Sequence, residues 1–319
     1  MSLSHSRVLV FGGSGFIGRY VVKRLAALGA TVGVPTRNIE KAKFLRPFGD
    51  VGQITPIPCQ MSSDASLRAV MQNADAVINL TGILFESGKN KFDLVHHKTP
   101  ARIAAIAREC GVKSLVHISA IGADANSNSA YARSKAKGET AILREFPNAV
   151  ILRPSIVFGP EDNFFNMFAG IAQIFHILPL IGGGQTKFQP VYVADVADAV
   201  IAALSNDQAR GKIYELGGPK IYSFTELMRI MLQQTGQKAC LISVPFWWAK
   251  VKAAFLQLMP KPLLTIDQVR MLEKDNIVGA SVLKLKDLGV TPTALDVILP
   301  SYLDRYKIGG RMGNTDQAA

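Results

Sequence analysis

A glycine-rich segment that directly follows a short apolar run restricts the possible folds of this chain more than any other feature. Residues 8–11 are apolar, residues 12–18 read Gly-Gly-Ser-Gly-Phe-Ile-Gly, and residues 17–28 carry apolar side chains at helical spacing. Glycines at this spacing let a strand turn tightly into a helix and let backbone amides approach a pyrophosphate. The segment therefore predicts a dinucleotide site at the first strand-to-helix turn of an α/β fold.

Strand-length apolar runs alternate with amphipathic stretches through the first half of the chain. The later runs are residues 31–34, 53–56, 76–80, 114–118 and 149–152. Apolar strands between helices are typical of a parallel sheet that is covered on both faces. We therefore expect an α/β protein with a doubly wound, Rossmann-type parallel sheet and a smaller C-terminal α/β lobe.

The domain boundaries are expected where this alternation loosens. Residues 1–155 are predicted to form the NADP(H)-binding domain, with segments near residues 186–216 returning to it. Residues 156–306 are expected to form a lobe that contacts a substrate or partner, and residues 307–319 a mobile polar tail.

The charge and cysteine content narrow the possible partners. Thirty-six Lys and Arg residues against 24 Asp and Glu residues give a net charge of +12. This excess favours a nucleotide, a nucleic acid or an anionic lipid surface. No recognisable nucleic-acid reader accompanies it, so no nucleic-acid partner is expected. The three distant cysteines and the other possible ligands lack metal-binding spacing, so no metal is expected, and a reducing compartment fits.

The N-terminal segment and the lengths of the apolar runs bear on location. Residues 1–7 carry neither the apolar core of a signal peptide nor an Arg-rich presequence. No apolar run approaches the roughly 20 residues that span a bilayer. We therefore expect a cytoplasmic protein that can be peripheral on the inner face of the cytoplasmic membrane.

The residues after the second predicted strand indicate which dinucleotide binds. No acid precedes Glu40 there, so the carboxylate that would bind the adenosine ribose of NAD(H) is missing. Arg37 is placed to pair with a 2′-phosphate, and Arg19 in the first turn of the helix is a second candidate cation. NADP(H) is therefore expected in preference to NAD(H). The alternative is that both arginines are ordinary solvated side chains.

Tyr131 and Lys135 form the candidate acid/base pair. They are four residues apart after the fifth predicted strand, so on a helix they share a face. A lysine ammonium there would lower the pKa of the phenol and reach a nicotinamide ribose, as hydride transfer with a tyrosine acid/base requires. The alternative is a solvated helix face.

These motifs resemble the short-chain dehydrogenase/reductase superfamily in its extended or atypical branch, which is similar to NAD-dependent epimerases and dehydratases. The resemblance covers nearly the whole chain and rests on residues 12–18, 131–135, 153–160 and 189–196. It implies that Tyr131, Lys135 and Ser119 are the candidate catalytic residues. The cofactor site expected from the motifs and the resemblance consists of Gly12, Gly13, Ser14, Gly15, Phe16, Ile17, Gly18, Arg19, Arg37, Gln60, Met61, Leu80, Thr81, Gly82, Ser119, Tyr131, Lys135, Pro154 and Ser155.

Within this branch the chain looks most like the nucleotide-binding accessory subunits of respiratory complex I and their bacterial relatives. The similarity is carried by residues 79–82, 131–139, 158–166, 189–196 and 263–269. Those subunits bind NADPH tightly and have a structural or assembly role near the quinone-binding region, without established turnover. Other relatives are linked to ubiquinone biosynthesis. The resemblance therefore implies a structural or assembly function associated with complex I or quinone metabolism.

Departures from the superfamily pattern bear on catalysis. Ser119 ends the fifth strand only 12 residues before Tyr131, so it is expected to contact cofactor rather than a substrate carbonyl. Ser127 or Ser129 could supply the missing hydroxyl, although polar loop residues are usually solvated. Gln60 or the backbone would hold the adenine. The alternative function is an active NADP-dependent oxidoreductase, epimerase or dehydratase acting on an apolar or quinone-like substrate.

His96 and His97 precede a helix whose start, in this superfamily, faces the nicotinamide side of the cleft. A histidine there could donate a proton. Solvated or capping histidines are commoner, so neither is placed among the catalytic candidates.

Residues 245–262 contain the candidate partner surface. Residues 246–259 read as a short basic amphipathic helix that holds both tryptophans of the chain, and no acid occurs between Glu226 and Asp267. Such a helix fits a membrane interface. It also fits a face packed on its own domain or on a subunit of complex I, and the pattern leaves these alternatives open.

Overall fold

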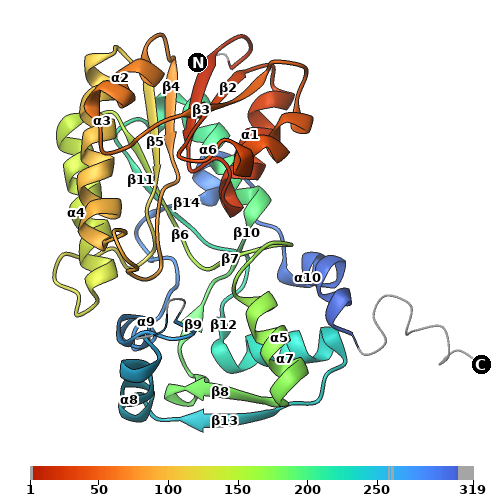
Figure 1. Cartoon of the computed structure of the whole chain (residues 1–319). Coiled ribbons are helices and arrows are strands. Elements are labelled where there is room, and N and C mark those ends of the chain that lie inside the picture. Colours follow the sequence, from red (N-terminus) through yellow and green to blue (C-terminus); the bar gives the residue numbers. More distant parts are fainter. Residues whose placement is uncertain (1–2, 258, 260–261, 308–319) are drawn as a thin grey trace, which may run out of the picture. The chain divides into compact units, whose positions relative to one another are not determined.

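A computed structural model of the chain describes residues 3–257, 259 and 262–307. The chain divides into two compact units, and each is described by itself (Figure 1). Unit 1 comprises Met1–Pro154, Val193–Leu216 and Gly279–Thr291; unit 2 comprises Ser155–Tyr192, Gly217–Val278 and Pro292–Ala319. Apart from Lys307, the expected tail lies outside the described residues.

An eight-stranded parallel sheet forms the centre of unit 1, which confirms the expected fold class. The strand order is β14-β11-β6-β5-β4-β1-β2-β3. The strand order reverses direction between β1 and β4, and ligands of doubly wound sheets bind at the carboxyl ends of strands at such a switch point. The strands are β1 (Arg7–Phe11), β2 (Thr31–Thr36), β3 (Ile54–Pro58), β4 (Ala76–Asn79), β5 (Ser114–Ile118), β6 (Val150–Pro154), β11 (Ile213–Leu216) and β14 (Leu283–Lys284).

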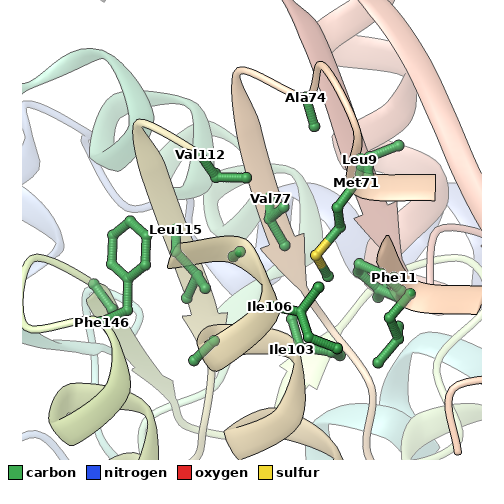
Figure 2. Close-up of a cluster of buried hydrophobic side chains, with 14 of the residues drawn as sticks. Leu9, Phe11, Met71, Ala74, Val77, Ile103, Ile106, Val112, Leu115 and Phe146 are labelled. Atoms are coloured by element: carbon green, nitrogen blue, oxygen red, sulfur yellow. The ribbon is translucent and has the colours of Figure 1, made fainter. Parts of the chain in front are cut away.

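Helices cover both faces of this sheet, which explains why its strands are apolar runs rather than alternating patterns. On one face lie α2 (Asp64–Met71), α3 (Thr99–Glu109) and α4 (Ala130–Glu145); on the other lie α1 (Phe16–Ala27) and α6 (Val193–Ser205) (Figure 1). Arg24 of α1 donates from Nε to Asp198 of α6 over 2.7 Å. Figure 2 shows the core beneath α2 and α3, where Leu9, Phe11, Val77 and Leu115 meet Met71, Ile103 and Ile106. Shorter helical segments are η1 (Glu40–Phe48), η2 (Asp93–Lys98), η4 (Asp207–Ala209) and η5 (Leu285–Leu288).

Unit 2 is built from helices and three two-stranded sheets. The strand pairs are β7 (Val157–Phe158) with β10 (Val191–Tyr192), β8 (Ile177–Ile181) with β13 (Cys240–Val244), and β9 (Lys187–Phe188) with β12 (Tyr222–Ser223). The first two pairs are parallel and the third is antiparallel. The helical elements are α5 (Phe165–Phe175), η3 (Gly182–Gly184), α7 (Phe224–Thr235), α8 (Phe246–Leu256), α9 (Ile266–Met271), α10 (Leu295–Leu303) and η6 (Asp304–Tyr306).

A buried carboxylate joins α5 to α10 in unit 2. Asp162 accepts hydrogen bonds from the backbone amides of Phe164 and Asn166, and the Tyr302 hydroxyl donates to it over 2.6 Å. Burial raises the pKa of Asp162 despite these donors. Much of the 158–166 motif therefore serves packing within this unit.

Candidate functional site

The glycine-rich turn has the geometry of a pyrophosphate cradle. Gly12 has a φ of +79°, and Gly15 is the residue that precedes α1. A Cβ on Gly18 would collide with the carbonyl oxygen of Gly12, and a Cβ on Gly12 would lie 3.1 Å from the Leu80 backbone. Both glycines are therefore needed for α1 to pack against the turn and for the ends of β1 and β4 to approach. The free amides and the dipole of α1 suit an anion here.

The remaining turn residues leave accessible surface at this helix end. Gly15 is exposed, whereas Ser14, Phe16 and Ile17 are half-buried and Gly13 is buried. The amide of Gly13 donates to the Val10 carbonyl over 3.1 Å, which fixes the turn. The structure thus brings the predicted turn residues together as one continuous cradle.

The two candidate 2′-phosphate cations lie on elements around the end of β2. Arg37 is exposed in the residue after this strand. The guanidinium carbon of Arg19 lies 5.1 Å from the centroid of the Phe44 ring in η1, which holds that side chain beside the segment after Arg37. Their role toward a 2′-phosphate stays a prediction.

The predicted residues after β3 and β4 lie at the carboxyl edge of the sheet. Gln60 is exposed, and its backbone amide donates to the Ser66 hydroxyl over 3.0 Å. Met61 packs against the core below α2 and α3. Asn79 accepts hydrogen bonds from the amide and the hydroxyl of Thr81, which orients the segment Leu80–Thr81–Gly82. Parallel strands make these segments neighbours, as the motif requires.

Tyr131, Lys135 and Ser119 meet at the carboxyl end of β5. The Ser129 hydroxyl caps α4 by accepting from the amide of Ala132, so Tyr131 lies in the first turn. The Lys135 ammonium donates to the Ile118 carbonyl over 3.2 Å and lies 5.9 Å from the centroid of the Tyr131 ring. Ser119 follows Ile118 and is buried. The structure therefore brings the three candidate catalytic residues together.

The ionisation of Tyr131 differs from the expectation. Burial raises the pKa of Tyr131 to about 12, whereas the neighbouring lysine was expected to lower it. Burial also lowers the pKa of Lys135 to about 8, although the Glu139 carboxylate acts in the opposite direction. Desolvation is therefore the main cause of both pKa shifts.

His96 was left outside the predicted site, but it is buried against Tyr131. Its ring centroid lies 5.2 Å from that of Tyr131, in an edge-to-face contact. The amide of Ile83 donates to Nε2 over 3.0 Å, so Nδ1 carries the proton and donates to the Ser134 hydroxyl over 2.9 Å. Burial, reinforced by the charge of Lys135, lowers the pKa of His96 to about 3. His96 is thus a neutral positioning residue whose two ring nitrogens are both engaged.

Several buried polar atoms near Tyr131, Lys135 and Ser119 have no hydrogen-bond partner among the described residues. They are Nδ2 of Asn79, both ring nitrogens of His117 and Oγ of Ser119. Asn79 and His117 are paired across β4 and β5, at the carboxyl ends of these strands. Buried donors and acceptors ordinarily have partners, so this set fits a ligand with amide and hydroxyl groups. The described residues thus fit a dinucleotide. The sequence signal for His117 is a polar residue within an otherwise buried strand.

Pro154 and Ser155, expected beside the nicotinamide, have different local environments. Pro154 pairs with Leu216 between β6 and β11. The Ser155 hydroxyl lies 2.7 Å from Oδ1 and 2.9 Å from the carbonyl oxygen of Asn276, and it accepts from the amide of Gln189. The Ser155 hydroxyl therefore has partners within unit 2, and contact of either residue with a nicotinamide stays a prediction.

The parallel sheet, the glycine cradle at its switch point and the tyrosine–lysine pair define a dinucleotide-binding α/β protein of the short-chain dehydrogenase/reductase type. The chain belongs to the NAD dependent epimerase/dehydratase family, whose model matches residues 8–217. The family resemblance predicted from the motifs is confirmed. Across the described residues, no group of three or more His, Cys, Asp or Glu side chains could hold a metal ion.

Relatives along nearly the whole chain are subunits of a respiratory enzyme. The NADH dehydrogenase [ubiquinone] 1 alpha subcomplex subunit 9, mitochondrial, of Arabidopsis thaliana is 38% identical and matches 97% of this chain and 80% of its own length. The mouse protein of the same name is 34% identical and matches 96% and 82%, respectively. A ceramide reductase of Caulobacter vibrioides is 27% identical over 75% of this chain and 73% of its own length.

Solved structures of nucleotide-sugar enzymes share the fold. The structure of MoeE5 in complex with UDP-glucose and NAD matches with a TM-score of 0.72 and 18% identity over 93% of this chain and 97% of its own. DesIV, a dTDP-glucose 4,6-dehydratase from Streptomyces venezuelae with NAD bound, matches with a TM-score of 0.68 and 21% identity over 94% and 96%. At these identities the likeness concerns the fold.

Proposed function

We propose that this chain binds NADP(H) tightly as a structural cofactor and serves as a structural or assembly subunit associated with respiratory complex I or quinone metabolism. The complete glycine cradle and the orphaned polar atoms beside Lys135 support the binding of a dinucleotide. The relatives of 34–38% identity, which match nearly the whole of this chain and are NADH dehydrogenase [ubiquinone] subunits by name, support the association.

The observation that carries the structural role is the state of Tyr131. Burial raises the pKa of Tyr131 to about 12 and so moves it away from the operating pH, near which proton transfer is most efficient. His96, the nearest other acid/base group, has both ring nitrogens engaged and is neutral. The site therefore binds and orients better than it transfers protons.

Preference for NADP(H) is proposed from the segment after β2. Arg37 is exposed there and residues 36–39 contain no acid, so a 2′-phosphate would meet a guanidinium and no carboxylate. Arg19 would add a second positive charge from α1. The contact of Arg19 with Phe44 of η1 holds its guanidinium beside the helical segment that follows Arg37.

A second candidate function is favoured by one observation. Lys135 has a pKa of about 8 and shares a face with Tyr131, as an active site would require. In this alternative, bound NADP(H) supplies the hydride while Tyr131 holds the proton and Lys135 orients the ribose. An active oxidoreductase, epimerase or dehydratase would then act on an apolar or quinone-like substrate.

The partner surface is proposed at residues 245–262, with the protein peripheral on the inner face of the cytoplasmic membrane. No helix among the described residues is long and apolar enough to cross a bilayer. The helix α8 ends at Leu256 rather than at Met259 as expected, and the prolines that follow in the sequence disfavour its continuation. Ala249 and Ala253 face inward, whereas Trp247 and Phe255 are 66% and 71% exposed.

Turnover measurements separate the two functions. The purified protein is incubated with NADPH and quinone-type substrates, and with NADP(H) and nucleotide sugars. Absorbance of the reduced nicotinamide is followed for the quinones and conversion of the sugar for the nucleotide sugars, in the wild type and in Tyr131→Phe. The structural proposal predicts no substrate conversion by either protein, whereas conversion by the wild type that disappears in Tyr131→Phe would establish the enzyme instead.

A further inference from the structure

The parallel pair β8–β13 in unit 2 presents an apolar face to solvent. Leu178 and Leu180 of β8 point into the core, and the alternate positions Ile177 and Pro179 are exposed. The register places Pro179 opposite Ile242 of β13, which is also exposed. Successive strand residues point to opposite faces, so these side chains share one outward surface.

Exposed apolar residues continue this surface at both ends of the strand pair. At the start, α5 ends in Ile174 and Phe175, which are 70% and 67% exposed, and His176 connects them to β8. At the other end, Pro245 connects β13 directly to α8 with its exposed tryptophans. Figure 1 shows β8 and β13 between the end of α5 and α8 along one edge of unit 2. We call this surface the apolar strip; it consists of Ile174, Phe175, Ile177, Pro179, Ile242, Trp247, Trp248, Val251 and Phe255.

The strip is large enough for an interface. Five strand residues extend ~16 Å and the 11 residues of α8 extend another ~16 Å. Contiguous exposed apolar surface on this scale marks an interaction site.

Basic side chains border the strip. Lys238 precedes β13 and Lys252 lies on α8; both are exposed, and the Lys252 ammonium lies 5.7 Å from the centroid of the Trp248 ring. Lys250 pairs with Glu273 over 2.5 Å. No acid occurs between Glu226 and Asp267, the part of the sequence that contributes β13 and α8. Glu273 offsets the charge of Lys250, so Lys238 and Lys252 supply the positive charge that complements an anionic surface.

A small hollow opens beside the α5 end of the strip. It is lined by Ala172, Gln173, His176, Gln237, Lys238 and Tyr306. The Gln237 side chain is buried and its Oε1 has no hydrogen-bond partner among the described residues. Lys238, which lines this hollow, places a cation beside the apolar side chains at this end of the strip.

We propose that the apolar strip docks unit 2 on an anionic phospholipid bilayer, with β8–β13 and α8 entering the interface together. The inference deepens the partner part of the proposed function and rests on it, but it extends the surface beyond residues 245–262. Tryptophan and phenylalanine beside lysine are the side chains that a bilayer interface selects. A protein partner or a second copy of the chain is an outcome that the test distinguishes.

Two native probes report on the two halves of the strip. Trp247 and Trp248 are the only tryptophans, so intrinsic fluorescence reports on α8. Cys240 is exposed on β13 opposite Ile177, whereas Cys59 is buried, so a bimane label on Cys240 in a Cys110→Ser background reports on the strands. Vesicles of equal parts phosphatidylcholine and phosphatidylglycerol are compared with phosphatidylcholine alone. Blue shifts of both probes on the anionic vesicles are expected, and a tryptophan shift without a bimane shift overturns the composite surface.

Substitutions test the same claim by co-sedimentation with these vesicles. The double variants Ile177→Ser/Ile242→Ser and Trp247→Ser/Trp248→Ser are each expected to bind about tenfold more weakly, because each removes apolar area from the interface. Val51→Ser, at a fully exposed apolar residue in unit 1, is the control and should bind as the wild type. Wild-type binding by the strand variant, or no vesicle binding by the wild type, overturns the proposal.

The oligomeric state and the nucleotide content separate bilayer docking from dimerisation and from failure of the proposed function. If sedimentation equilibrium shows a dimer that both double variants dissociate, a second copy covers the strip and the bilayer proposal is wrong. Nucleotide content is measured on the same preparations. If the protein binds vesicles but contains no nucleotide, the proposed function is contradicted and the proposal for the apolar strip is not. If the protein contains NADP(H) but does not bind vesicles, the proposal for the strip is contradicted and the proposed nucleotide binding is not.

Discussion

The His96 imidazole donates to the Ser134 hydroxyl, which in turn donates to the backbone carbonyl of Tyr131 over 2.7 Å. This relay joins η2 to the first turn of α4 and places a neutral ring against the phenol of Tyr131. The contact is possible because Gly138 lies against the His96 carbonyl, where a Cβ would collide. These contacts thus hold the first turn of α4 and the Tyr131 ring in a fixed position.

Acid sensitivity should follow from the buried histidine. In the folded protein the pKa of His96 is lowered to about 3 from an ordinary value of 6.5. Between these values the unfolded chain binds more protons, so stability falls as the pH falls through this window. Protonation of His96 in the unfolded chain should lower the free energy of unfolding by about 2 kcal/mol between pH 7 and pH 5. Urea unfolding at both pH values should show a smaller loss in His96→Gln, with the half-exposed His97→Gln as control; equal losses in all three would contradict the assignment.

Alkaline stability should respond to Lys135. Its pKa is about 8 in the folded protein against 10.5 ordinarily, so the unfolded chain binds more protons between these values. Stability of the nucleotide-free protein should therefore rise, relative to Lys135→Met, by up to about 3 kcal/mol from pH 8 to pH 10.5. The exposed Lys137→Met is the control. Parallel pH profiles for wild type and Lys135→Met would show that Lys135 titrates normally.

The glycine cradle predicts opposite effects for two helical glycines. Gly18→Ala places a Cβ against Gly12 and Gly13, and should destabilise the protein by at least about 2 kcal/mol and release bound nucleotide. Gly170 in α5 has open space around it, so Gly170→Ala should stabilise by roughly 0.5–1 kcal/mol. Thermal unfolding and nucleotide content measure both. Similar stability and nucleotide content in the two variants would refute the packing argument.

Arg37 should determine selectivity between the two dinucleotides. Because we propose that its guanidinium pairs with the 2′-phosphate, Arg37→Ala should weaken NADPH binding about tenfold and leave NADH binding unchanged. Arg46→Ala, an exposed arginine in η1, should change neither. Calorimetric titration of the nucleotide-free proteins gives both affinities, and an equal loss for NADPH and NADH would remove this role.

The features that the sequence predicts well are those with a local cause. The turn at Gly12, Gly15 and Gly18 follows from backbone geometry, and residues 114–118 form a strand with the expected bounds because an apolar run of that length must be covered on both faces. Tyr131 and Lys135 share a face because helical periodicity requires it.

What could not be predicted depends on contacts between distant segments. The pKa of Tyr131 is raised because the fold buries it, an effect that spacing alone does not contain. His96 is engaged through the backbone of Ile83 and through α4, which local pattern does not place beside it. Likewise, the outward face of β8 appears only when it pairs with β13, more than 50 residues later in the chain.

The central claim is that the chain holds NADP(H) as a resident structural group. Mass spectrometry of the nucleotide released by denaturing the purified protein tests it most directly. The account predicts NADP(H) in about equimolar amount to the chain, since tight binding survives purification. Protein that purifies without nucleotide but readily binds it, or that carries NAD(H), would contradict it.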